Sequence, residues 1–117
     1  MAVKYYDWLA HHDDIHGDKI AIRDLDTKQD ISYRNLNRRA DSLAAYLQNN
    51  GIKKGDRVAL LIRNCPAFFE AQFACSKIGA ICLPLNWRLT PNELSYILND
   101  ATPCALIHDH VFADTAP

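Results

Sequence analysis

The sequence has few glycines, and none of them lies in a glycine-rich loop. The 117-residue chain contains four glycines that are isolated from one another, with no Gly-x-Gly-x-x-Gly or Gly-Lys-Ser/Thr pattern. A loop that cradles phosphate groups needs such glycines, because its backbone N–H groups must approach the phosphate oxygens closely. A Gly-x-Ser-x-Gly nucleophile turn is also absent from the sequence. By itself, the chain shows no means of holding ATP or of supplying a nucleophile.

The sequence also lacks an excess of positive charge and a long apolar run. Its net charge of −1 disfavours nucleic acid as a partner, because no basic surface would attract a phosphate backbone. No apolar run approaches the roughly 18 to 20 residues that cross a bilayer. The first eight residues have an early acid and no apolar core, so they are unlike a secretory signal. Apolar residues make up 49% of the chain, which predicts a folded domain with a modest core.

No pair of cysteines has the Cys-x-x-Cys spacing. Three of the four cysteines lie in apolar stretches, which is typical of reduced thiols that pack as small apolar side chains. A disulfide or a structural zinc site is the alternative interpretation. Reduced thiols predict a cytoplasmic location. The cysteines are Cys65, Cys75, Cys82 and Cys104.

Histidines gather near the N-terminus. His12 and His16 are four residues apart, a spacing that would suit metal ligands on one face of a helix. However, Asp13-Asp14 and Gly17 indicate that the helix is ending there, so we interpret this segment as a solvated helix end. We therefore predict no metal site in the chain.

The N-terminal third predicts a helix, a hairpin and a second helix. The first helix covers about residues 5–12, with Trp8 and Leu9 on its apolar side, and strands at 19–24 and 31–33 form the hairpin. The longer second helix has an apolar stripe formed by Leu36, Ala40, Leu43, Ala44 and Leu47. Ser32 is expected to cap its start, and Gly51 is expected to end it in a left-handed conformation.

The rest of the sequence predicts a parallel sheet. Segments near 57–62, 80–84 and 104–108 are apolar without alternation, as are strands that are covered on both faces. The intervening helices begin at Pro66 and at a Thr90–Glu93 capping box. The first of these helices is expected to turn Phe69, Phe73, Ala74 and Ile78 inward. The fold class is therefore α/β, a partial doubly wound sheet of βαβ units, with a further helix starting near residue 111.

Several short motifs occur together in one order and spacing. They are Ile31-Ser32-Tyr33-Arg34-Asn35-Leu36, Gly55-Asp56-Arg57-Val58-Ala59-Leu60, Asn64-Cys65-Pro66, Lys77-Ile78-Gly79-Ala80 and Pro84-Leu85-Asn86-Trp87-Arg88-Leu89-Thr90. In this order the chain resembles the adenylate-forming (AMP-binding) superfamily, over about residues 3–110. Asn86-Trp87-Arg88-Leu89 resembles the acyl-CoA synthetase branch, including the fatty-acyl ligases, rather than the peptide-synthetase adenylation domains.

The resemblance implies an enzyme that joins a carboxylic acid to a thiol. ATP and a fatty or aryl carboxylate would form an acyl-adenylate, and the thiol of coenzyme A would then displace AMP. ATP, Mg²⁺ and CoA are the implied cofactors of the full-length parent. Residues 1–117 would be the truncated N-terminal part of its large adenylation domain, without the phosphate loop and C-terminal domain. We therefore expect the fragment to be inactive and to bind none of these cofactors.

The resemblance also implies one binding residue. Arg88 follows a buried strand, at the edge where parallel sheets place their ligands, and the matching arginine of related ligases is thought to meet a CoA phosphate. The alternative is a structural arginine that pairs with Glu93. Trp87 is expected to pack, or else to line a substrate channel. Asn86 is expected only to order the turn.

Two rival interpretations remain at this stage. The chain could be a non-catalytic doubly wound interaction module, or a truncated relative with a scaffolding role. As a fragment, it would offer apolar surfaces and strand edges to the remainder of its own enzyme or to a second copy of itself.

Overall fold

The computed structural model describes residues 6–113, which form four α-helices, five strands and one 3-10 turn. In chain order they are α1 (Trp8–His16), β1 (Ile20–Asp24), β2 (Gln29–Ser32), α2 (Tyr33–Asn49), β3 (Arg57–Leu61), α3 (Pro66–Ile78), β4 (Ile81–Pro84), α4 (Pro91–Ala101), β5 (Ala105–His108) and η1 (His110–Phe112). The helix expected from residue 111 is a short 3-10 turn as far as the structure describes it, and residues 114–117 lie outside the described part.

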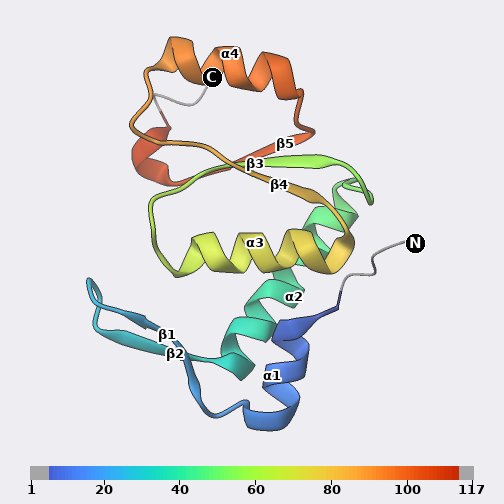
Figure 1. The fold of residues 1–117 in the computed structure, drawn as a ribbon, viewed down its shortest axis with the longest axis vertical. Coiled ribbons are helices and arrows are strands. Elements are labelled where there is room, and N and C mark those ends of the chain that lie inside the picture. Colours follow the sequence, from blue (N-terminus) through green and yellow to red (C-terminus); the bar gives the residue numbers. More distant parts are fainter. Residues whose placement is uncertain (1–5, 114–117) are drawn as a thin grey trace.

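The three predicted strands form one parallel sheet in the order β4-β3-β5. Strand β3 is buried as expected, but β4 and β5 lie at the edges of the sheet and their residues are half-buried or exposed. Leu60 lies opposite Pro84 on one side and Ile107 on the other. Figure 1 shows α3 on one side of this sheet and α4 on the other. The predicted α/β architecture of βαβ units is therefore confirmed.

Strand β3 is covered on both faces, which explains its apolar sequence. Val58 and Leu60 belong to a cluster with α2 and α3, whereas Ala59 and Leu61 belong to a second cluster with Leu94 of α4. All four β3 side chains have 0% exposure. Alternate residues of one strand thus fill two cores, because successive side chains point to opposite faces.

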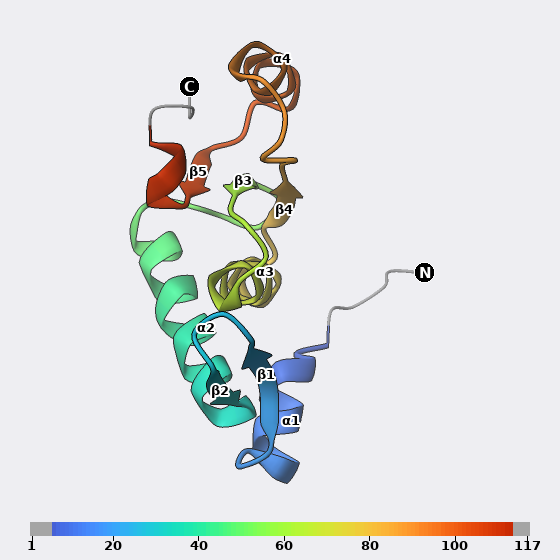
Figure 2. The ribbon, with the colours of Figure 1, turned by 90° about the vertical axis from the view of Figure 1, so that its left-hand side faces the viewer.

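The N-terminal elements form a second, smaller assembly. Strands β1 and β2 are antiparallel, as predicted, and pack with α1 and α2 around Leu9, Ile31 and Leu36. Figure 2 shows α2 running from this assembly up to the sheet. The Ser32 hydroxyl caps α2 by accepting from the N–H of Asn35, and Gly51 follows its end with a φ of +89°, as expected.

The structure corrects four expectations about single residues. Helix α1 continues to His16 rather than ending near His12, because Asp13 stays within the helix and accepts from Asn37 of α2. Asp7 caps the start of α1 by accepting from the N–H of Ala10. Trp8 is 58% exposed, since the buried side of this helix centres on Leu9. Phe69 does not face the core and is 41% exposed. All four cysteines are free, but Cys104 is exposed rather than buried.

Among the described residues, no helix combines the length and the apolar character that crossing a bilayer requires.

Candidate functional site at the carboxyl edge of the sheet

The carboxyl ends of β3, β4 and β5 meet at one edge of the parallel sheet. Polar residues follow each strand there: Arg63 and Asn64 after β3, Asn86 and Arg88 after β4, and Asp109 after β5. In open parallel sheets, ligands bind outside this edge because the loops that leave the strands surround it. The edge is therefore the part of the fold in which a binding residue is expected.

The turn after β4 is held in place at both ends and in its middle. Leu85 is buried at 7% exposure, and its N–H donates to the carbonyl oxygen of Leu60 at 2.8 Å. The side-chain oxygen of Asn86 accepts from the backbone N–H of Arg88 at 3.0 Å. The backbone carbonyl oxygen of Asn86 accepts from the N–H of Leu89 at 3.1 Å. Asn86 thus orders the turn, as predicted, and fixes the backbone from which Arg88 projects.

Arg88 lies on an aromatic stack. Its guanidinium carbon is 4.5 Å from the centre of the Trp87 ring, within the range of a cation–π contact. The other side chain against Trp87 is Phe112, whose ring centre lies 6.0 Å away at an interplanar angle of 29°. Trp87 is half-buried in the cluster that covers the α4 face of the sheet, in keeping with a packing role.

The alternative partner of Arg88 is engaged elsewhere. Glu93 accepts from the hydroxyl of Thr90 at 3.0 Å, and its own N–H donates to that hydroxyl at 3.2 Å, which completes the capping box of α4. Within residues 6–113, no carboxylate lies within ion-pair distance of Arg88. The alternative of an Arg88–Glu93 pair is therefore not seen, because Glu93 turns back to cap its own helix.

The second arginine of the edge differs from Arg88 in this respect. Arg63 pairs with Asp109 at 3.2 Å and thereby connects the segments that follow β3 and β5. Its charge is largely balanced by this carboxylate. Arg88 is consequently the arginine of the edge whose N–H donors face no acidic partner within the described residues.

A buried lysine forms a separate polar cluster between the helices. The side chain of Lys77, in α3, is only 8% exposed, and its Nζ lies 2.8 Å from Asp7 and 2.9 Å from Asp41. Nζ also donates to the side-chain oxygen of Asn37 at 2.7 Å, and Asn37 in turn donates to Asp13 at 2.9 Å. Residues of α2 and α3 and the cap of α1 thus meet at one ammonium group.

The ion pairs in this cluster determine the direction in which the pKa of Lys77 and that of Asp7 are shifted. Burial alone would lower the pKa of Lys77, but the hydrogen bonds and charges of Asp7 and Asp41 outweigh burial and raise it. Burial would likewise raise the pKa of Asp7, yet Lys77 and the N–H of Ala10 hold it below its usual value. Both groups are therefore charged near neutral pH, and the cluster is structural.

The helical spacing of the sequence places Lys77 on the buried side of α3, although none of the motifs described above indicates this cluster. Lys77 lies three and four residues after Ala74 and Phe73, both of which face inward, so helical spacing places it on the buried side of α3. A lysine there must find acidic partners or lose its charge.

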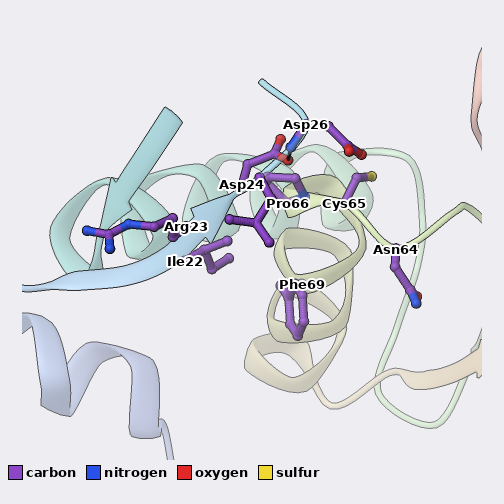
Figure 3. A pocket seen from close by; sticks show the side chains of 9 residues that line it. Ile22, Arg23, Asp24, Asp26, Asn64, Cys65, Pro66 and Phe69 are labelled. Carbon is purple, nitrogen blue, oxygen red and sulfur yellow. Dashed lines mark hydrogen bonds between the residues drawn. The ribbon is translucent and has the colours of Figure 1, made fainter. Parts of the chain in front are cut away.

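A hollow lies between the β1–β2 hairpin and the start of α3. Figure 3 shows Phe69 of α3 on its wall, opposite Ile22 and Asp24 of β1, which accounts for the exposure of Phe69. The cavity measures about 230 Å³. Two of its polar groups are already engaged, since Arg23 pairs with Asp30 and Asp24 accepts from Thr27. The hollow therefore offers less for recognition than the carboxyl edge does.

The described residues form a partial doubly wound α/β sheet, a class of fold in which ligands bind outside the carboxyl ends of the strands. Comparison with known proteins narrows this class. The sequence profile described as AMP-binding enzyme matches residues 9–117. The chain belongs to this family of AMP-binding enzymes.

Curated relatives with similar sequences are CoA ligases. The chain is 34% identical over 114 residues to the 3-oxocholest-4-en-26-oate–CoA ligase of Rhodococcus rhodochrous, which covers 97% of this chain and 20% of that protein. It is 44% identical over 85 residues to a feruloyl-CoA synthase of Amycolatopsis sp, covering 73% of this chain and 17% of that protein. The chain thus spans about a fifth of the length of these relatives.

Solved structures give the same result. A fatty acyl CoA synthetase of Mycobacterium tuberculosis superposes with a TM-score of 0.88 at 32% identity, over 93% of this chain and 22% of that one. An anthranilate CoA ligase in complex with anthranoyl-AMP superposes with a TM-score of 0.89 at 26% identity, over 97% of this chain and 22% of that one. The fold described above is that of the N-terminal part of such enzymes.

Proposed function

We propose that this chain is the N-terminal part of an ATP-dependent carboxylate–CoA ligase, and that Arg88 helps to bind coenzyme A. The family and the CoA ligases among its relatives support the reaction class. In this reaction a carboxylate, which is a poor electrophile, gains a good leaving group as an acyl-adenylate before the thiol attacks. Four free cysteines are in keeping with a cytoplasmic enzyme.

The described residues fit only one of the implied cofactors. A magnesium ion needs several oxygen ligands, and residues 6–113 contain no group of three side chains arranged to hold a metal ion. The isolated glycines likewise offer no loop for the phosphates of ATP. Arg88, in contrast, suits a phosphate group of CoA. We therefore propose that adenylation depends on other parts of the enzyme, and that this chain alone does not catalyse it.

The observation that carries the CoA role is the state of the Arg88 side chain. Stacking on Trp87 leaves the edge of the guanidinium plane free to donate, and no carboxylate within residues 6–113 neutralises it. A planar fork of N–H donors matches two phosphate oxygens, so the arginine would bind a phosphate without first breaking an ion pair. Fatty and aryl acids are the substrate classes that the relatives suggest.

The test replaces Arg88 by Ala in the complete enzyme, with Arg38→Ala, an exposed change on α2, as the matched control. Adenylation is measured as pyrophosphate exchange. Thioester formation is measured as the release of AMP at varied CoA concentrations. We expect the KM for CoA to rise about tenfold or more, since a charge-assisted hydrogen bond contributes about 1.5 to 3 kcal/mol, while pyrophosphate exchange stays unchanged. An unchanged KM for CoA in Arg88→Ala would reject the CoA role. Failure of the unaltered complete enzyme to exchange pyrophosphate with any carboxylate would reject the ligase assignment.

A further inference from the structure

The last two turns of α1 bring two imidazole rings together. His12 and His16 lie one turn apart on the same side of a continuous helix, and Nδ1 of His12 is 3.1 Å from Nε2 of His16. Both rings are half-buried, and the ring of Tyr33, at the start of α2, packs on each of them at centre distances of 5.2 and 5.1 Å. The two nitrogens are therefore held close together by tertiary packing as well as by helical spacing.

We propose that His12 and His16 form a two-histidine site for a late first-row transition-metal ion, such as Cu²⁺, Ni²⁺ or Zn²⁺. Nitrogen ligands at about 2.0 to 2.1 Å from a metal lie about 2.9 Å apart in square-planar geometry and about 3.4 Å apart in tetrahedral geometry. The observed separation falls inside this range. The ring planes must turn, so that both nitrogens point at the ion instead of at each other.

The chemistry of the pair suits such an ion, because neutral imidazole binds metals through a ring nitrogen. In the metal-free pair, one proton lies between the two facing nitrogens. Metal binding moves it to the other nitrogen of the same ring, so neutral histidines release no net proton.

The site is distinct from the carboxyl edge, since it lies on α1 in the N-terminal assembly (Figure 1). With two protein ligands, the remaining coordination positions belong to water. Hard cations such as Mg²⁺ and Ca²⁺ prefer oxygen ligands and are poor candidates. The expected order of affinity is Cu²⁺ above Ni²⁺ and Zn²⁺.

The experiment titrates the purified chain, free of any histidine tag, with CuCl₂ in a buffer that does not chelate. Calorimetry gives stoichiometry and affinity, and electron paramagnetic resonance gives the number of nitrogen ligands. We expect one ion per chain with two nitrogen ligands. His12→Ala should weaken binding by about tenfold or more, because even the loss of a group that merely supports a ligand costs 10- to 100-fold.

His11→Ala is the matched control, because Nδ1 of this neighbouring histidine lies 3.0 Å from the hydroxyl of Tyr6 and its ring only packs edge-on against His12. It should retain the affinity of the unaltered chain within about twofold. Far-ultraviolet circular dichroism checks the fold of each variant, and His16→Gln replaces His12→Ala if the latter unfolds. Equal affinity in the pair variants and the unaltered chain, or the absence of a saturable equivalent of Cu²⁺, overturns the proposal.

Discussion

Replacing Lys77 by Met removes the ammonium group around which the three helical segments meet and keeps most of the apolar side chain. The change leaves the side-chain oxygen of Asn37, a residue with only 8% exposure, without its lysine donor. Asp7 keeps the N–H of Ala10 as a partner, and the side chain of Asp41, at 59% exposure, returns to water. The damage therefore falls mainly on one buried acceptor.

The magnitude follows from these partners. A buried acceptor without a donor costs about 1 to 3 kcal/mol, and each of the two partly exposed ion pairs contributes at most about 1 kcal/mol. We expect Lys77→Met to lower the free energy of unfolding by roughly 2 kcal/mol. In urea this loss moves the midpoint by about 1 M for a chain of this size. Lys53→Met, at an exposed turn residue, is the control and should change the midpoint little.

The pH dependence gives a second test of the same reasoning. Because folding lowers the pKa of Asp7, its contribution is present above the ordinary pKa of 3.8 and is lost as the pH falls through the folded pKa. Because the pKa of Lys77 is raised, its contribution is present below 10.5 and is lost as the pH rises through the folded pKa. The difference between Lys77→Met and the unaltered chain should therefore be largest between these limits and shrink in acid. A difference below about 0.5 kcal/mol at pH 7, or one that stays constant down to pH 2, would refute an ion-paired lysine.

Two further predictions concern local conformation and assembly. Gly79 and Gly51 both have positive φ, so each Gly→Ala change should lower the free energy of unfolding in urea by about 1 to 2 kcal/mol. Gly79→Ala should cost more of this free energy, because its Cβ would lie 2.9 Å from Cγ of Lys54. At Gly51 an added Cβ would have nothing within 4 Å. Equal costs would show that the Lys54 contact is immaterial. We also propose that the chain self-associates, because β4 and β5 each pair only with β3 in the described residues and Ile81 and Tyr96 are 50% and 74% exposed. Static light scattering should show a mass above 13.3 kDa at high concentration, and a monomer there would contradict the proposal.

Elements that follow from local chemistry could be predicted from the sequence. Ser32, Thr90 and Gly51 act through neighbours only a few residues away, and each has the expected geometry at its helix end. The parallel sheet was also predictable, because a strand that fills two cores has apolar residues in succession, as β3 has at positions 58–61. In these cases one segment contains both the cause and the effect.

Features that depend on distant partners were not predictable in the same way. Helical spacing predicts the burial of Lys77. Its ion pairs could not be predicted, because its acidic partners lie 70 and 36 residues away in the sequence. The predicted end of α1 is too early because the acidic pair Asp13-Asp14 favours a helix end in the sequence, whereas Gly17 does follow the last helical residue. In the structure Asp13 accepts from Asn37 of α2, and a tertiary contact thus keeps the acidic residue within the helix.

The position of Arg88 depends on both local contacts and contacts with residues distant in the sequence. Local chemistry supplies the Asn86 turn, and burial of Leu85 against the sheet fixes where that turn begins. The ring of Phe112, 24 residues after Arg88, supports the Trp87 ring on which the guanidinium lies. A side chain held in this way loses little additional entropy when it binds a phosphate, because its orientation is already set in the free protein. The packing of the α4 face therefore bears directly on the proposed affinity for CoA, even though most of that face contacts no ligand.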